Sequence, residues 1–309
     1  MTEKLFQIVT TLYNEESIVD EFINEIDIVV KELDNKDIEI ILVDNGSTDK
    51  TFDELTKHSE LNKNIKIIKL IRNFGIDGGL RAGIEHSKGD ATILMHGDLQ
   101  DDPKLITEMV KSWEDGNEQV LVRYLPKKRE NLIRKIGSYI YYKWAAFASE
   151  NLIIYGVSDF RLISKNIVES LKELPENINL LRGILIWPGY KYSIIDTSKR
   201  KRVGGISKID LPNTVRYFRQ PLALSAKLLY VLPLVSIFVF FISITFILST
   251  LIYWLSTGNL IIQLEPRLTL ILVFNTITII FLGILGVYVA IIFEEIKRRP
   301  NYIVEKIVN

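Results

Sequence analysis

Cysteine is absent from this chain of 309 residues, and histidine and methionine occur only three times each. Without cysteine the chain has no disulfide bond, no catalytic thiolate and no cysteine ligand for a metal, which agrees with a reducing compartment. Charge of one sign is not in excess either, because 38 basic side chains balance 38 acidic ones. The overall charge therefore excludes no class of partner, and the length allows one large domain or two of medium size.

Charged residues and histidine are missing from two long stretches, residues 228–255 and 268–293. Each stretch is longer than the roughly 20 apolar residues that cross a bilayer core. Each is also longer than a typical globular helix, so we predict two transmembrane helices rather than buried core helices. The short connector, residues 256–267, makes the pair an antiparallel hairpin.

The orientation of the predicted hairpin follows from its basic flanks. The connector has only Arg267, set against Glu265, whereas the outer flanks hold Arg216, Arg219, Lys227, Lys297, Arg298 and Arg299. Positive flanks stay inside, so both termini and the soluble part are predicted to be cytoplasmic, at the cell membrane. The first residues lack a basic start followed by an uninterrupted apolar stretch, and we expect no cleavable signal peptide.

Short apolar runs alternate with amphipathic stretches from residue 1 to about 125. The runs predict strands at residues 5–12, 38–43, 65–70, 91–95 and 119–124. Apolar residues at helical spacing predict a helix from Ile18 to Leu33 with Asn14 as its N-cap. Asp102 and Pro103 begin a further helix. The alternation predicts an α/β fold with a doubly wound sheet, whose ligands bind beyond the carboxyl ends of the strands.

Two later stretches are amphipathic and lie nearer the apolar hairpin in the sequence. Residues 132–148 combine an apolar face with several lysine and arginine side chains. This composition is typical of a helix in the headgroup plane of a membrane. A helix packed on the sheet has the same periodicity, so both readings stay open. Residues 210–227 run almost directly into the first span, which favours the membrane interface.

Polar clusters follow two of the predicted strands. The segment DNGSTDKT (44–51) follows the second strand, and HGDLQDDP (96–103) follows the fourth. Acidic and amide groups at neighbouring strand ends can receive a nucleobase, a ribose and a divalent metal that bridges a diphosphate. Either cluster alone has the composition of an ordinary turn. Together, at equivalent strand ends, they favour a nucleotide site.

A series of motifs extends this interpretation along nearly the whole chain. They are LYNEE (12–16), VDNGSTDKT (43–51), RNFGIDGGLRAGIEHSKGD (72–90), MHGDLQDDP (95–103), SDFRL (158–162), LLRG (180–183), GGISK (204–208) and EEIKRRPNYIVE (294–305). In this order they resemble the polyprenyl-phosphate glycosyltransferases of glycosyltransferase family 2, a group that includes bactoprenol glucosyltransferases and dolichyl-phosphate mannose synthases. The resemblance implies a GT-A type nucleotide-diphospho-sugar transferase fold and the inverting transfer of one sugar, with UDP-glucose as the first choice of donor, to polyprenyl (undecaprenyl) phosphate. It also implies a divalent metal, magnesium or manganese, and a homo-tetramer; no nucleic-acid partner is expected.

The resemblance assigns roles to individual positions. The donor site would contain Leu12, Tyr13, Glu15, Asp44, Arg81 and Asp98. The metal would be held by Asp98, Gln100 and His96, and the catalytic groups would be Asp98, Asp159 and Arg161. The acceptor or its phosphate would be bound by Arg123, Arg129, Arg202, Ser207 and Lys208. A lipid-facing charge run is the alternative for these cations, because basic segments near membranes need no catalytic role.

Three positions depart from the family pattern, and each replaces an aspartate. Asn45 stands where a second Asp is common, His96 replaces the first Asp of the D-x-D motif, and Gly156 stands where an Asp usually precedes the SDFRL-like element. Neutral imidazole ligates manganese or zinc but brings no negative charge for magnesium. Either the metal preference shifts, or the ion rests mainly on Asp98, Gln100 and the donor diphosphate.

These expectations divide the chain into a cytoplasmic GT-A catalytic domain (1–209, with an interfacial helix at 132–148), a juxtamembrane helix (210–227), the hairpin and a cytoplasmic tail (294–309). Three other functions are alternatives to a polyprenyl-phosphate glycosyltransferase. A processive polysaccharide synthase would carry a Q-x-x-R-W element, which is missing here, and more than two spans. A non-catalytic membrane scaffold would fit the loss of motif acids at His96 and Asn45. A lipid carrier or channel needs a polar pathway, which spans without an ionisable residue do not offer.

Overall fold

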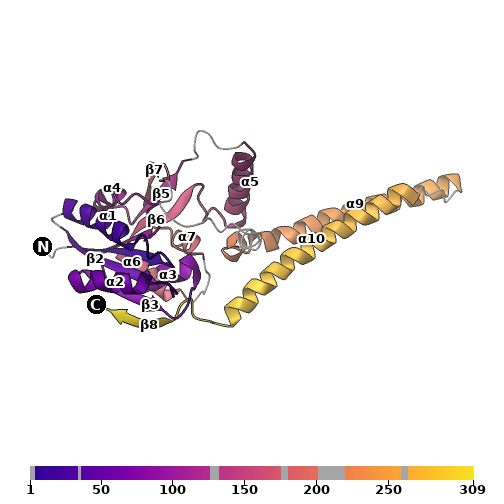
Figure 1. Ribbon diagram of the computed structural model, residues 1–309. Coiled ribbons are helices and arrows are strands. Elements are labelled where there is room, and N and C mark those ends of the chain that lie inside the picture. Colours follow the sequence, from indigo (N-terminus) through magenta and orange to yellow (C-terminus); the bar gives the residue numbers. More distant parts are fainter. Residues whose placement is uncertain (1–3, 34–35, 126–131, 175–179, 201–219, 259–263) are drawn as a thin grey trace.

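The computed structural model describes residues 4–33, 36–125, 132–174, 180–200, 220–258 and 264–309 (Figure 1). An eight-stranded sheet with the order β7-β5-β6-β4-β1-β2-β3-β8 forms the centre of the domain. The five strands predicted from the sequence are confirmed as β1 (Leu5–Leu12), β2 (Asp37–Asp44), β3 (Ile65–Leu70), β4 (Ala91–His96) and β5 (Gln119–Tyr124). Three further strands are β6 (Val157–Ser164), β7 (Tyr192–Thr197) and β8 (Val304–Val308).

The sheet is mixed rather than a regular doubly wound sheet. Strands β4, β1, β2 and β3 are parallel, but β6 enters antiparallel between β4 and β5, and β8 is antiparallel to β3. The register pairs Leu12 with Asp44 and Thr11 with His96. The carboxyl ends of β1, β2 and β4 therefore meet at one edge of the sheet, where the sequence places its polar clusters.

Helices cover both faces of the sheet, as predicted. They are α1 (Val19–Glu32), α2 (Thr51–Leu61), α3 (Gly75–Glu85), α4 (Leu105–Glu114), α6 (Lys165–Glu173) and the short α7 (Leu181–Ile184). Phe22 of α1 and Met109 of α4 are buried in one apolar layer, and Leu80 of α3 and Ile167 of α6 are buried in the other. Because β-strands alternate their side chains, β1 contributes Ile8 to the first layer and the adjacent Val9 to the second.

The predicted N-cap of the first helix is wrong. Helix α1 begins at Val19, and Ile18 precedes it without a side-chain cap. Asn14 instead has a positive φ of 54° and joins the loop after β1 to the loop after β2. Its side-chain oxygen accepts the backbone N–H of Thr48 at 2.8 Å, and its own N–H donates to the hydroxyl of Ser47 at 3.1 Å. A polar residue before a helix thus serves a loop contact that local spacing does not reveal.

Two long apolar helices, α9 (Lys227–Thr257) and α10 (Leu264–Ile296), project from the domain (Figure 1). Within them, Lys227–Thr245 and Val273–Ile296 are long and apolar enough to be candidate membrane spans, and only 6% of each segment's most apolar window is buried. Their outer surfaces expose large side chains such as Phe238 and Ile279. Both candidate spans overlap the stretches predicted from the sequence.

Helix α5 (Leu132–Ala148) stands beside the base of this hairpin (Figure 1). Its buried Ala148 clusters with Leu222 and with Tyr288 of α10. No described residue of α5 belongs to the two apolar layers of the sheet. In the described part of α5, the buried residues Ala145 and Ala148 thus cluster with Ile153, Leu180, Leu222 and Tyr288. Ile136 and Ile140 remain more than half exposed, at 51% and 61%.

The segment after α10 returns to the catalytic domain. Strand β8 pairs with β3 along the sheet edge, so the predicted tail at 294–309 contains part of the sheet. Tyr302 donates its hydroxyl to Glu85 of α3 at 2.7 Å. The exit of the second apolar helix is thereby fixed to the domain that carries the polar clusters.

Candidate active site

The loops after β1 and β2 form one rim of the site. Leu12 is buried, whereas Tyr13 and Glu15 are half-buried beside it. The backbone N–H of Glu15 donates to the hydroxyl of Thr51 at 2.9 Å, which holds the first loop against the second. The predicted donor residues Leu12, Tyr13, Glu15 and Asp44 are therefore brought together at the carboxyl edge of the sheet.

Asp44 is a fully buried carboxylate with one unused oxygen. Its Oδ1 accepts the backbone N–H of Ser47 at 3.1 Å, while Oδ2 is buried and, within the described residues, has no hydrogen-bond partner. Burial raises the pKa of this carboxyl. A buried acceptor without a partner costs about 1–3 kcal/mol. Such a group at a strand end is a ready acceptor for a ligand N–H.

Asn45 has a structural role that explains the departure from aspartate. Its side-chain N–H donates to the carbonyl of Gly75 at 2.9 Å, and its oxygen accepts the N–H of Phe74 at 3.0 Å. An amide supplies both the donor and the acceptor that these two contacts need, whereas an ionised carboxylate has no donor. The loop after β2 is thereby fixed to the start of α3.

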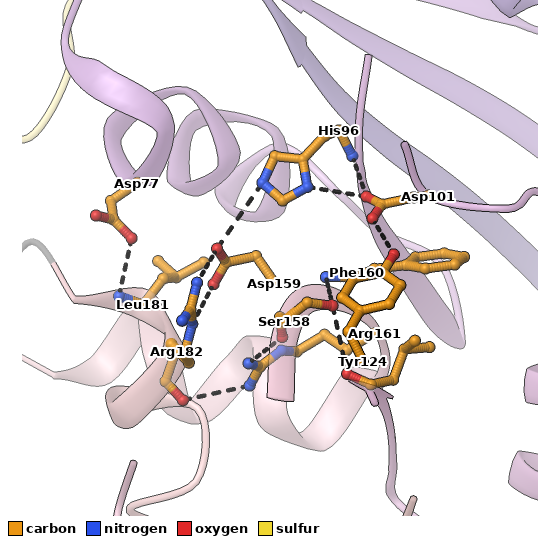
Figure 2. A network of polar contacts seen from close by, with 11 residues as sticks. Asp77, His96, Asp101, Tyr124, Ser158, Asp159, Phe160, Arg161, Leu181 and Arg182 are labelled. Carbon is orange, nitrogen blue, oxygen red and sulfur yellow. Dashed lines mark hydrogen bonds and ion pairs between the residues drawn. The ribbon is translucent and has the colours of Figure 1, made fainter. Parts of the chain in front are cut away.

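The loop after β4 contains a hydrogen-bonded chain of His96, Asp101 and Tyr124 (Figure 2). Asp101 is buried and accepts from the ring Nδ1 of His96 at 2.8 Å, from the His96 backbone N–H at 2.9 Å and from the Tyr124 hydroxyl. Burial alone lowers the pKa of His96, but the hydrogen bond and charge of Asp101, with the charges of Asp159 and Asp98, raise it to about 9. Burial raises the pKa of Asp101, and the contacts with His96 bring it below its usual range.

Asp159 forms a bidentate ion pair with Arg182 of α7 (Figure 2). The distances are 3.1 Å from Nε to Oδ1 and 2.7 Å from Nη2 to Oδ2. Burial raises the pKa of Asp159, but Arg182 and the nearby His96 hold it well below its usual range. The His96 Nε2 lies 3.8 Å from Asp159 Oδ2, which joins this pair to the loop after β4.

Arg161 is fully buried beneath the pair and supports its backbone. It donates to the carbonyl of Ser158 at 2.9 Å and to the carbonyl of Arg182 at 3.3 Å. Burial lowers the pKa of its guanidinium to about 10, although Asp159 acts in the opposite direction. The predicted residues Asp159 and Arg161 are thus brought together, with Arg161 directed at the backbone that carries Arg182.

A cavity of about 180 Å³ opens beside the Asp159 and Arg182 pair. Its other walls come from the first turn of α3, from α5 and from the segment before α9, and the lining residues are Gly75, Ile76, Asp77, Tyr141, Tyr142, Ile153, Leu180 and Gln220. Sequence reasoning included LLRG among the motifs but did not assign Arg182, Asp101 or Tyr124 to the site. The motif itself was the available signal for Arg182.

The remaining predicted residues lie in several places. Asp98 and Gln100 are half-buried in the loop after β4, where the N–H of Gln100 donates to Asp98 at 3.2 Å. Arg81 pairs with Glu85 at 2.9 Å, on the side of α3 where Tyr302 binds. Arg123 forms a bidentate pair with Asp196 at 2.6 and 2.8 Å. Arg129, Arg202, Ser207 and Lys208 lie outside the described residues.

Two of the three positions that depart from the family pattern, Gly156 and His96, can be compared with the structure. Gly156 has a φ of +72°, and its carbonyl accepts the N–H of Tyr124, so the position suits a glycine rather than the usual aspartate. Among the described residues no group of three or more histidine and carboxylate side chains forms a ready metal site. The loop after β4 instead offers the Asp98 and Gln100 oxygens, and the Nδ1 of His96 already contacts Asp101.

Comparison with known proteins identifies the family. The model of the family described as "Glycosyl transferase family 2" matches residues 7–172, which begin within β1 and include β2 to β6. The chain belongs to glycosyl transferase family 2. It is accordingly a glycosyltransferase, and the non-catalytic scaffold has no support.

Relatives within the family match nearly the whole chain. The SfII prophage-derived bactoprenol glucosyl transferase of Shigella flexneri is 30% identical over 307 residues, 97% of this chain and 97% of that protein. The uncharacterized glycosyltransferase YkcC of Bacillus subtilis (strain 168) is 28% identical over 302 residues, 97% of this chain and 93% of that protein. Among solved structures, the chain resembles glucosyl-3-phosphoglycerate synthase from Mycobacterium tuberculosis in complex with Mn²⁺, UDP and phosphoglyceric acid. The TM-score is 0.50 at 16% identity, and the match covers 72% of this chain and 77% of that chain. The fold is of the GT-A type.

Proposed function

We propose that this family 2 glycosyltransferase moves one sugar from a nucleotide-diphospho-sugar, UDP-glucose in the first instance, to a polyprenyl phosphate such as undecaprenyl phosphate. One observation carries the proposal: the cavity beside Asp159 and Arg182 is lined on its other side by Tyr141 and Tyr142 of α5 and by Gln220, and α5 packs against the base of the apolar hairpin. A lipid whose reactive phosphate stays at a membrane surface would reach such a cavity. The names of the bactoprenol glucosyl transferases that resemble this chain agree with a lipid carrier and with glucose.

The donor would lie along the rim formed by the loops after β1, β2 and β4. The unused Oδ2 of Asp44 would accept the N–H of a uracil ring, and Tyr13 and Glu15 would border the nucleotide. Asp98 and Gln100 supply hard oxygen ligands that suit Mg²⁺ or Mn²⁺, ions that keep substrate phosphates in their coordination shell. When bound, the metal would stabilise the negative charge of the departing diphosphate. A ligand role for His96 would use its Nε2, since Nδ1 contacts Asp101, and would require Nε2 to lose the proton that the raised pKa of His96 favours.

The acceptor needs no strong general base. A phosphate monoester has a second pKa near 6 and is largely ionised at neutral pH. Its oxygen would attack the anomeric carbon in line, and the nucleoside diphosphate would leave with inversion of configuration. Asp159, already paired with Arg182, would orient the sugar or acceptor rather than remove a proton. Most of the rate would come from positioning and charge stabilisation.

The membrane arrangement belongs to the same proposal. The two candidate spans would anchor the enzyme in the cell membrane, with the catalytic domain and both termini in the cytoplasm, as the basic flanks indicate. A homo-tetramer remains an expectation from the family resemblance.

A panel of nucleotide sugars tests this function. The full chain, purified in detergent, is incubated with undecaprenyl phosphate, Mn²⁺ or Mg²⁺ and each donor in turn, and the lipid product is identified by mass spectrometry. The proposal predicts a single hexose added to the lipid phosphate, with the largest yield from UDP-glucose. A ladder of several sugars would indicate a processive synthase, and no product with any donor and either metal would refute lipid phosphate as the acceptor.

A further inference from the structure

Arg182 uses only part of its guanidinium to hold Asp159. The pair engages Nε and Nη2, at 3.1 and 2.7 Å. Within the described part of the chain, Nη1 makes no hydrogen bond. It is also not one of the buried side-chain atoms that have no hydrogen-bond partner. The side chain is 32% exposed, whereas the carboxylate of Asp159 is only 14% exposed. A guanidinium has five N–H donors in a rigid fork, so a second anion can bind while the first remains.

In the described part of the chain, the cavity at this free edge is lined by one basic side chain, Arg182, and by two carboxylates, Asp77 and Asp159. Arg182 is the only basic residue among the described residues that line the cavity. The first turn of α3, at Gly75 and Ile76, lines the same cavity, and the N-terminus of a helix carries a partial positive charge. Asp77 also lines it and accepts the N–H of Leu181 at 3.2 Å. The anion would therefore lie on the Arg182 side.

We propose that the free edge of Arg182 binds the phosphate of the lipid acceptor, while Asp159 clamps the guanidinium in position. This inference rests on the proposed function and adds a residue to it. The donor diphosphate is the other anion in the reaction, but the donor rim lies at Asp44 and Asp98. The Arg182 cavity is lined by Tyr141 and Tyr142 of α5 and by Gln220, and α5 contacts the hairpin through Ala148 and Tyr288.

The clamp explains how the site tolerates two anions around one cation. Asp159 faces His96 at 3.8 Å in addition to Arg182, and Arg161 holds the Arg182 carbonyl at 3.3 Å. The arriving phosphate thus shares Arg182 without leaving Asp159 uncompensated. Arg182 is fixed at its backbone by Arg161 and at its side chain by Asp159, so little side-chain entropy is lost on binding.

The test compares two probes that differ only in the phosphate, farnesyl phosphate and farnesol. Binding of each to the full chain in detergent is measured by isothermal titration, without donor, for the wild type and for Arg182→Gln, Arg182→Lys and Lys36→Ala. Lys36 pairs with Glu114 at a similar exposure, 25% against 32%, is not among the residues that line the cavity, and is the matched control. The wild type and Lys36→Ala should bind farnesyl phosphate more tightly than farnesol. Arg182→Gln should lose this preference by about 10- to 100-fold, the range for hydrogen bonds to charged groups, and Arg182→Lys by less.

A double variant separates phosphate binding from a purely structural role. In Asp159→Asn with Arg182→Gln, no charge of the pair is left unpartnered, yet the preference for the phosphate should still be lost. A double variant that regains the preference, or an Arg182→Gln protein that keeps it, would overturn the inference.

Steady-state kinetics complete the test. Arg182→Gln should raise KM for the lipid phosphate by about 10- to 100-fold and leave KM for the donor within about threefold. An unchanged KM for the acceptor together with normal transfer would refute the role of Arg182 but not the proposed function. A wild type that transfers to no polyprenyl phosphate would refute the proposed function, whatever the binding data show.

Discussion

Gly79 lies where α3 contacts β1, and replacing it tests whether that close contact builds the donor rim. A Cβ at Gly79 would lie 2.2 Å from the Thr11 hydroxyl oxygen, 2.9 Å from Thr11 Cβ and 3.2 Å from the Asn45 amide nitrogen. Ordinary contacts between non-bonded heavy atoms are about 3.5–4.0 Å. In Gly79→Ala the helix must therefore move away from the strand, and the Asn45 bridge to Gly75 moves with it.

The two opposing contributions to stability can be compared. Overpacking of a well-packed contact costs about 1–3 kcal/mol. Alanine in place of glycine within a helix gains about 1 kcal/mol. Gly79→Ala should therefore lower the free energy of unfolding by up to about 2 kcal/mol and raise KM for the donor. Gly137 of α5 has no heavy atom within 4 Å of a built Cβ, so Gly137→Ala should stabilise instead.

Thermal unfolding followed by intrinsic fluorescence, in one detergent for all proteins, measures both effects. The reasoning requires shifts of Tm in opposite directions for the two alanine variants. It would be refuted by a Gly79→Ala protein that is as stable as Gly137→Ala and keeps the donor KM of the wild type.

Three further predictions concern the metal, the hairpin and the contact between Tyr302 and Glu85. Asp98→Ala should abolish transfer of a labelled sugar with little change in Tm, and a chelator should do the same to the wild type until Mn²⁺ or Mg²⁺ is restored; activity retained by the variant would refute the metal role of Asp98. Replacing residues 228–296 with a short flexible linker, which keeps β8, should impair transfer to long-chain acceptors more than to short soluble ones, whereas equal loss would mean that the hairpin only supports folding. Tyr302→Phe removes the hydrogen bond to Glu85 and should cost about 1 kcal/mol of stability without changing either KM; no loss of stability would show that the contact at 2.7 Å is not energetically significant.

The first half of the fold was predictable because its strands are short apolar runs separated by polar turns. The run from Leu5 to Leu12 matches β1 to the residue. Strand β8 was not predicted, because VEKIV carries only a weak alternation and its partner β3 is more than 230 residues away in the sequence. Pairing over such a distance depends on the return of the chain after α10, which no local pattern contains.

The site could be predicted where a motif contains a polar residue and lies directly after a predicted strand. Asp44 and Asp98 follow strands that the pattern locates, so their shared edge could be inferred. Asn14 was misassigned because capping and loop contacts use the same side chain. Arg182 lies on a helix of four residues, too short to be recognised by periodicity, and its pairing with Asp159 depends on how α7 meets β6.

The central claim is that the nucleotide and the lipid phosphate occupy two separate parts of one site. Titration of UDP with Mn²⁺, and of farnesyl phosphate, into Asp44→Asn and Arg182→Gln measures this directly. We predict a crossed result: Asp44→Asn loses affinity for UDP and keeps its affinity for farnesyl phosphate, and Arg182→Gln does the reverse. If each substitution weakened both ligands equally, or neither ligand, the division of the site would be contradicted.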